Sequence, residues 1–198
     1  MRQAGRYLAE YREVRASEPD FISFCLNPEK AVKVTLQPIE RFKFDAAIIF
    51  CDILIVPWAL DRNVRFVAGE GPKLDPMETG DEITEAMIAA MAPRLKNVAT
   101  AIGNCRAALS VDKALIGFAG APWTIITYLL EGGSSRDFAT ARRWMWENDV
   151  RFDRLLDLIS QATADFLSLQ AKAGADTLML FDSWASAVPA HLRKKVVI

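Results

Sequence analysis

Short apolar segments alternate with long amphipathic segments along this chain, and this alternation restricts the fold more than any other feature. The strand candidates are Ala46 to Cys51, Lys113 to Phe118 and Thr177 to Phe181. Between them, apolar residues recur at helical spacing, for example from Phe152 to Leu169. Short strands that are apolar throughout are typical of parallel sheets, which are buried on both faces. The pattern therefore predicts an α/β architecture with a parallel sheet.

Two kinds of α/β fold fit this pattern, an open doubly wound sheet and a closed barrel. In both, the chemistry lies at the carboxyl ends of the strands. The strand candidates lack the glycine-rich phosphate motif that follows the first strand of nucleotide-binding sheets, so we favour a barrel. Repeats, low-complexity segments and linkers are not visible, and we expect residues 1–198 to form a single domain.

Charge and cysteine content indicate the surroundings of the protein. With 24 basic and 25 acidic side chains, the chain has no overall field that would hold nucleic acid or an anionic membrane, and we expect neither as a partner. The three cysteines are scattered without a CxxC pair, which is typical of reduced thiols in a cytoplasmic protein. The single histidine, His191, leaves little material for a zinc site or a histidine-based nucleophile.

The amino terminus has two possible roles. Residues 1–15 hold four arginines and two glutamates, so this segment could be a solvated end in which arginines pair with Glu10 and Glu13. Alternatively it forms an anion clamp, in which Arg2 and Arg6 flank small residues that let a ligand approach the backbone.

Asp52 is the only charge in the apolar stretch from Ala46 to Leu60. A carboxylate there is costly to desolvate and needs partners. It either caps the following turn or serves as a fixed anion at the end of a strand, where it would stabilise a cation or accept hydrogen bonds from ligand N–H groups.

Two further segments follow strand candidates. Gly117, Gly120 and Pro122 predict a tight turn, with Tyr128 beyond it as either a core aromatic residue or a ligand contact. Ser183 follows the third strand candidate. Because no base lies nearby in the sequence, we interpret Ser183 as a hydrogen-bond donor or cap rather than a nucleophile.

In order along the chain, four segments resemble signatures of the uroporphyrinogen decarboxylase family: MRQAGRYLAEYR, AAIIFCDILIVPWAL, IGFAGAPWTIITYLLEGGSS and QAKAGADTLMLFDSWA. The resemblance implies a (β/α)8 TIM-type barrel, present here as an incomplete barrel without its C-terminal strands. It also implies a carboxy-lyase that removes the four acetate carboxyl groups of uroporphyrinogen III in haem biosynthesis. Such enzymes form coproporphyrinogen III without a metal or organic cofactor, and the resemblance implies a homodimer.

The resemblance also assigns roles to individual residues. It implies that the carboxylates of the substrate are held by the run Arg2, Gln3, Ala4, Gly5 and Arg6. Asp52 matches the central aspartate of the family and is expected to be catalytic, with Arg2 helping to deliver a proton. Tyr128 and Ser183 match residues that contact the substrate.

Two alternatives stay open at this point. The chain could be a catalytically inactive fragment that only binds tetrapyrrole. It could also belong with the related corrinoid-linked methyltransferases, which share the barrel and use a zinc site. His191 lies outside any matching motif, in surroundings that resemble an exposed basic tail.

We predict that the 198-residue chain alone has little or no decarboxylase activity, because a complete barrel of this type takes about 250 residues. Anaerobic incubation of the purified chain with uroporphyrinogen tests this. Steady release of coproporphyrinogen would refute the prediction.

Overall fold

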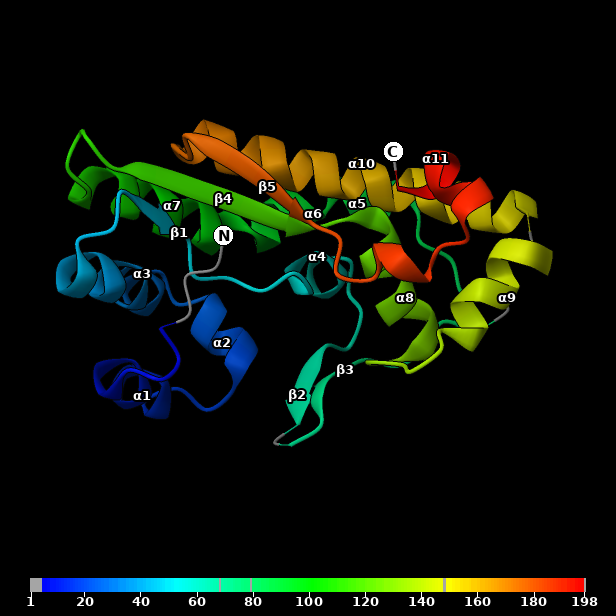
Figure 1. The fold of residues 1–198 in the computed structure, drawn as a ribbon, viewed down its shortest axis with the longest axis horizontal. Coiled ribbons are helices and arrows are strands. Elements are labelled where there is room, and N and C mark those ends of the chain that lie inside the picture. The colour runs from blue at the N-terminus through cyan, green and yellow to red at the C-terminus, as the bar shows by residue number, and fades with distance from the viewer. Residues whose placement is uncertain (1–4, 68, 79, 148, 198) are drawn as a thin grey trace. The chain divides into compact units, whose positions relative to one another are not determined.

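A computed structural model describes residues 5–67, 69–78, 80–147 and 149–197 (Figure 1). The chain forms two compact units. The first combines Met1–Asp52, Ala92–Phe118 and Phe166–Met179, and the second combines Ile53–Met91, Ala119–Asp165 and Leu180–Ile198.

The first unit contains a helical layer and most of a sheet. Its elements are α1 (Ala9–Ala16), α2 (Phe21–Cys25), α3 (Pro28–Phe42), β1 (Ala46–Ile48) and α7 (Lys96–Ala108), with α6 (Met91–Arg94) at its boundary. Like α6, three longer elements have residues in both units: β4 (Ala114–Gly120), α10 (Asp149–Ala173) and β5 (Thr177–Phe181).

The second unit contains the remaining elements. Its helices are α4 (Ile55–Ala59), α5 (Glu85–Ala89), α8 (Pro122–Glu131), α9 (Ala139–Glu147) and α11 (Arg193–Val196), with short 3-10 turns η1 (Ala185–Ala187) and η2 (Ala190–Leu192). The antiparallel hairpin of β2 (Arg65–Val67) and β3 (Gly71–Lys73) lies in a segment rich in glycine and proline.

The sheet has the order β1-β4-β5 and confirms the predicted parallel α/β arrangement. β1 pairs with β4 in parallel, with Ala47 opposite Leu115. Hydrogen bonds from Asp176 N to Leu115 O and from Ala121 N to Phe181 O show that β4 and β5 also run in the same direction. Because the strands are parallel, we expect a binding or active site at their carboxyl ends.

Helix α3 shows why the local sequence folds as it does. The Asn27 side chain caps the helix by accepting a hydrogen bond from Lys30 N at 3.2 Å, and Pro28 occupies the first turn. An Asn cap and a Pro in the first turn are both typical of helix starts. The helix ends at Phe42, and the capping residue after it, Lys43, has a left-handed φ of 57°. α3 packs against α7, and Thr35 of α3 accepts a hydrogen bond from Phe50 N at 2.9 Å, which fixes the chain just after β1.

Strand β4 is longer than the sequence predicts. The sequence pattern ends the strand at Phe118 and places a glycine turn after it, but β4 continues to Gly120 and Gly117 lies inside it. The reason is Gln170 of α10, which is fully buried and binds both backbone groups of Phe118. Its Nε2 donates to Phe118 O at 2.8 Å, and its Oε1 accepts from Phe118 N at 2.9 Å. A Cβ atom at position 117 would lie 2.6 Å from that Oε1, so glycine makes room for the amide.

β5 is an edge strand of this sheet, and its side chains are less buried than those of β4. Leu180 is 51% exposed, whereas Leu115 of β4 is fully buried. Within the described ranges, none of the helices is both long and apolar enough to cross a bilayer.

We predict that Gln170→Leu destabilises the protein by about 2–5 kcal/mol, because it removes both buried hydrogen bonds between the side-chain amide and the Phe118 backbone, at about 1–3 kcal/mol each. Urea unfolding followed by circular dichroism measures the change. The matched control is Gln161→Leu on the exposed side of the same helix, which should change stability by about 0.5 kcal/mol or less. Equal effects of the two substitutions would contradict this account of β4.

Candidate active site

Asp52 lies beyond the carboxyl end of β1, after Cys51 and before α4. The side chain is half-buried among apolar neighbours in the sequence, with Cys51 and Leu54 both buried. This is the strand-end position that the sequence predicts for a functional carboxylate.

Asp52 influences two buried thiols, those of Cys25 and Cys51. Burial raises the pKa of the Cys51 thiol to about 12, and the Asp52 carboxylate adds to the increase. Burial also raises the pKa of Cys25 well above its ordinary value, and Cys51 and Asp52 raise it further while the Arg6 guanidinium acts in the opposite direction. Asp52 and Arg6 therefore both lie close enough to Cys25 to influence the same thiol. The first unit brings these two predicted site residues into one neighbourhood.

The Arg6 side chain is exposed, and its guanidinium lies 5.3 Å from the centroid of the Phe21 ring. Phe21 belongs to a cluster of aromatic rings with Tyr11, Phe24 and Phe50. A cation over an aromatic face is attracted by the ring's quadrupole, so this cluster restrains Arg6 while leaving its donors accessible.

The structure describes only part of the rest of the amino-terminal segment, and it gives Glu10 a different partner from the predicted one. Gly5 is half-buried, and a Cβ atom there would lie 3.5 Å from Pro38 Cγ. Glu10 pairs with Arg41 of α3 at 2.9 Å, which differs from the predicted pairing with an arginine of the amino terminus. The reason is that α1 packs against α3 and brings Glu10 to that helix. The predicted site residues Arg2, Gln3 and Ala4 lie outside the described residues.

Tyr128 and Ser183 both belong to the second unit. Tyr128 lies on α8 and is 8% exposed, while Ser183 lies in an exposed turn directly after β5. The chain around Ser183 is bound to the start of α8: Thr124 Oγ1 donates to Asp182 Oδ1 at 2.6 Å, and Trp123 Nε1 donates to Trp184 O at 2.9 Å.

Sequence reasoning missed the pair formed by Thr124 and Asp182, which are 58 residues apart. The available signal was that Asp182 directly follows β5 and that Thr124 is the first polar side chain after β4. Strand ends of a parallel sheet lie at one edge, so polar residues that follow different strands can meet there.

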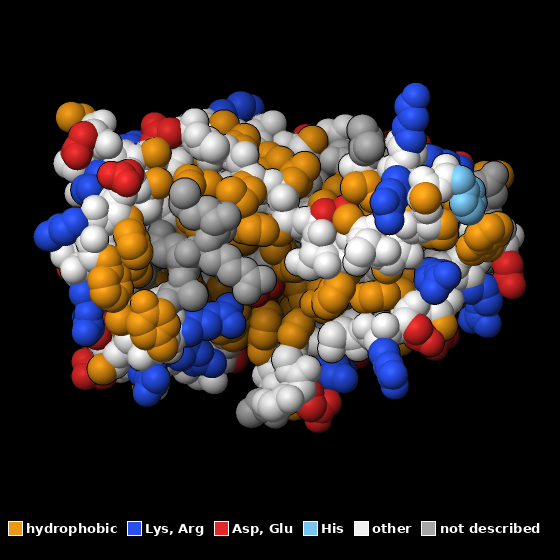
Figure 2. Space-filling model, in the orientation of Figure 1, with side chains coloured by type: hydrophobic (Ala, Val, Ile, Leu, Met, Phe, Trp, Pro, Cys, Tyr) orange, Lys and Arg blue, Asp and Glu red, His pale blue; other side chains and the backbone are white. Residues whose placement is uncertain are grey.

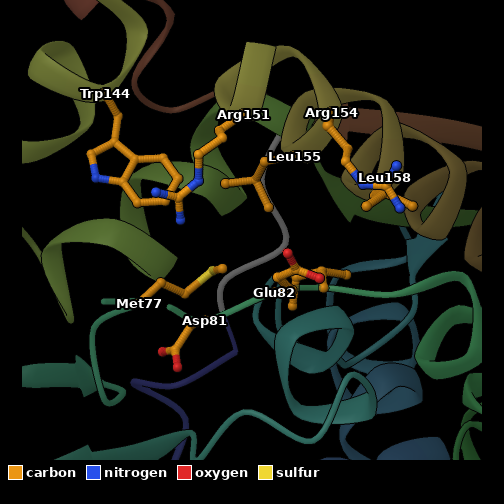
Figure 3. A pocket seen from close by; sticks show the side chains of 9 residues that line it. Met77, Asp81, Glu82, Trp144, Arg151, Arg154, Leu155 and Leu158 are labelled. Atoms are coloured by element: carbon orange, nitrogen blue, oxygen red, sulfur yellow. The ribbon is translucent and has the colours of Figure 1, made fainter. Parts of the chain in front are cut away.

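A separate small cavity of about 50 Å³ lies in the second unit (Figure 3). Met77, Trp144 and Leu155 contribute its apolar lining, and the Arg151 guanidinium lies 4.9 Å from the Trp144 ring centroid. The cavity has room for a few water molecules. None of the predicted site residues that the structure describes lines it.

His191 is exposed in η2, as the sequence predicts, and its ring lies 5.6 Å from that of Trp146. Figure 2 shows the histidine beside an apolar side chain on the surface. Among the described residues, no group of three or more histidine, cysteine, aspartate or glutamate side chains could hold a metal ion.

We predict that the three cysteines react slowly with a thiol reagent at pH 8 in the folded protein and rapidly in urea. The cause is burial, which holds the pKa of Cys51 at about 12 and that of Cys105 at about 11, so very little reactive thiolate is present. Labelling should accelerate as the pH rises, because each unit of pH raises the thiolate fraction tenfold. A thiol that reacts at pH 8 equally fast with and without urea would contradict the burial.

Known proteins are similar to this sequence over its whole length. The family model described as uroporphyrinogen decarboxylase (URO-D) matches residues 1–198. The uroporphyrinogen decarboxylase of Caulobacter vibrioides is 51% identical over 197 residues, which cover 100% of this chain and 56% of that protein. Its counterpart in Maricaulis maris is 48% identical over 204 residues, covering 100% of this chain and 57% of the relative. The chain thus spans about half the length of the curated relatives it matches.

Among solved structures, a methyltransferase from Methanosarcina mazei has a similar fold, with a TM-score of 0.73 over 94% of this chain and 54% of that one. At 17% identity, this likeness concerns the fold alone. The family match over residues 1–198, together with relatives near 50% identity, leads to one conclusion: the chain belongs to the uroporphyrinogen decarboxylase family.

Proposed function

We propose that this chain serves the decarboxylation of the four acetate side chains of uroporphyrinogen III to give coproporphyrinogen III, in haem biosynthesis and without a metal or organic cofactor. The observation that carries this proposal is the family match over residues 1–198. The neighbourhood that Asp52 shares with Arg6 supports it, because the reaction needs an anion for the ring and cations for the substrate carboxylates.

The chemistry explains the need for a fixed carboxylate. Loss of carbon dioxide from a pyrrole acetate leaves an electron pair, which a previously protonated, cationic pyrrole can accept. Asp52 would accept hydrogen bonds from pyrrole N–H groups and stabilise that cation. A close charge pair contributes about 4 kcal/mol at an effective dielectric constant of 20. Enzymes lower barriers by up to about 23 kcal/mol, so positioning and proton delivery supply the rest.

The other site residues have binding roles in this proposal. Substrate carboxylates would be held by the run Arg2, Gln3, Ala4, Gly5 and Arg6, since guanidinium groups bind carboxylates in bidentate fashion. Arg2 would also help to deliver the proton. Asp52 is the stronger catalytic assignment, because an arginine releases its proton only with difficulty. Tyr128 and Ser183 would donate hydrogen bonds to the substrate.

The proposal also covers the fold, the cellular location and the oligomeric state. Residues 1–198 would form one domain, an incomplete (β/α)8 barrel, which the fold likeness to the Methanosarcina mazei chain supports. A cytoplasmic location is consistent with three buried free cysteines. A homodimer rests on the family resemblance, and the partner is a small molecule rather than nucleic acid.

The corrinoid-linked methyltransferase is the weaker candidate. Its support is a fold likeness at 17% identity, whereas decarboxylases of Rhodospirillum rubrum and Caulobacter vibrioides are 46% and 51% identical to the chain. A catalytically inactive fragment that only binds tetrapyrrole is the other alternative, and turnover separates it from the decarboxylase.

We predict that a chimera, in which this chain replaces the matching 56% of the Caulobacter vibrioides relative, converts uroporphyrinogen to coproporphyrinogen. Asp52→Asn in the chimera should lower kcat by about 100-fold or more, the usual effect of removing one preorganised electrostatic partner. The matched control is Asp45→Asn, which removes an exposed carboxylate just before the same strand and should leave kcat within about threefold.

Product analysis by chromatography under anaerobic conditions measures both rates. A chimera that folds and binds uroporphyrin without releasing coproporphyrinogen would favour the binding-only alternative. Equal rates for the Asp52→Asn and Asp45→Asn variants would contradict the role of Asp52.

A further inference from the structure

We infer that Thr124 is a positioning residue that holds Ser183 in place for the substrate, an inference that rests on the proposed function. Thr124 lies in the first turn of α8 and is fully buried. Its hydroxyl therefore cannot contact a ligand directly. Thr124 can influence substrate binding only through the groups that its hydroxyl binds.

The Thr124 hydroxyl binds both neighbours of Ser183. Its Oγ1 donates to Asp182 Oδ1 at 2.6 Å and accepts from Trp184 N at 3.2 Å. A hydroxyl has one proton to donate and two lone pairs to accept with, so both bonds can form at once. The bond to a carboxylate is of the stronger, charge-assisted kind.

Two further hydrogen bonds hold the same turn, but each binds the chain either before or after Ser183 and not on both sides of it. Trp123 Nε1 donates to Trp184 O at 2.9 Å, and Ala121 N donates to Phe181 O at 2.9 Å. Figure 1 shows the connection after β5 beside the start of α8, where these bonds form. Thr124 is thus the side chain that spans Ser183, whereas the others anchor the flanking backbone.

Helix geometry links Thr124 to the second predicted substrate contact. Tyr128 is four residues further along α8, and side chains at this spacing lie on the same face of a helix. A shift of the turn after β5 would therefore change the placement of Ser183 relative to the helix face that carries Tyr128.

The chain offers a matched control in Thr127. This residue is also buried on α8, but its Oγ1 donates to Thr124 O at 2.7 Å, which is a bond within the helix. Replacing either threonine by valine keeps the shape and removes one hydroxyl. Only the change at position 124 removes a bond to the turn that carries Ser183.

The test is a fluorescence titration of the 198-residue chain and its variants with uroporphyrin. Thr124→Val should weaken binding about tenfold, which corresponds to about 1.4 kcal/mol. Thr124→Ser, which keeps the hydroxyl, and Thr127→Val should each stay within about twofold of the unaltered chain. Amide hydrogen exchange at Trp184 should accelerate in Thr124→Val and not in Thr127→Val.

A double-mutant cycle separates positioning from general destabilisation. If Thr124 acts through Ser183, then Thr124→Val should add less than about a twofold loss in a Ser183→Ala background. A further tenfold loss in that background would overturn the inference, as would equal binding by Thr124→Val and the unaltered chain. Failure of the unaltered chain to bind uroporphyrin would contradict the proposed function, and the inference with it.

Discussion

The structure depends on the central strand β4, which must be completely paired because it is buried. β1 satisfies one side of it in parallel register, with Ile48 opposite Ile116. On α10, the buried amide of Gln170 satisfies both backbone groups of Phe118. Unpaired backbone groups in such a place would each cost about 1–3 kcal/mol. A slip of one residue would also turn every side chain of the strand to the other face, so the register is strongly specified.

The register of β4 fixes β1 beside it and therefore the chain that leads to Asp52. The Phe50 N bond to Thr35 holds this chain from the helical layer. Cys25 and Cys51 lie in the same neighbourhood, and their raised pKa values keep both thiols protonated near neutral pH. The thiols therefore do not compete with Asp52 for a cation. In the proposed function, Asp52 would use this strand-end position to stabilise a positive charge that develops on the bound ring.

The sequence predicts those parts of the structure that depend on local pattern. The short apolar runs predict parallel strands, and this prediction is confirmed. The start of α3 also depends on local residues, because Asn27 caps the helix and Pro28 stands in its first turn. The position of Asp52 beyond the carboxyl end of β1 is also predictable, although β1 ends at Ile48 and not at Cys51 as the apolar run predicts.

Features that depend on distant partners are not predictable from one sequence. The local pattern around Gly117 indicates a turn, but this residue lies within β4 and makes room for Gln170 of α10. The sequence predicts a local partner for Glu10, yet packing of α1 on α3 gives it Arg41. The bond from Thr124 to Asp182 likewise joins a helix start and a strand end that only the fold brings together.

The most direct test of the central claim is a crystal structure of the chain with a bound uroporphyrin-type macrocycle. We expect oxygen atoms of Asp52 to lie at hydrogen-bonding distance, about 2.7–3.2 Å, from pyrrole nitrogens, with the Arg6 guanidinium at a ring carboxylate. A macrocycle bound away from the end of β1, or bound with the Asp52 oxygens turned from its nitrogens, would contradict it.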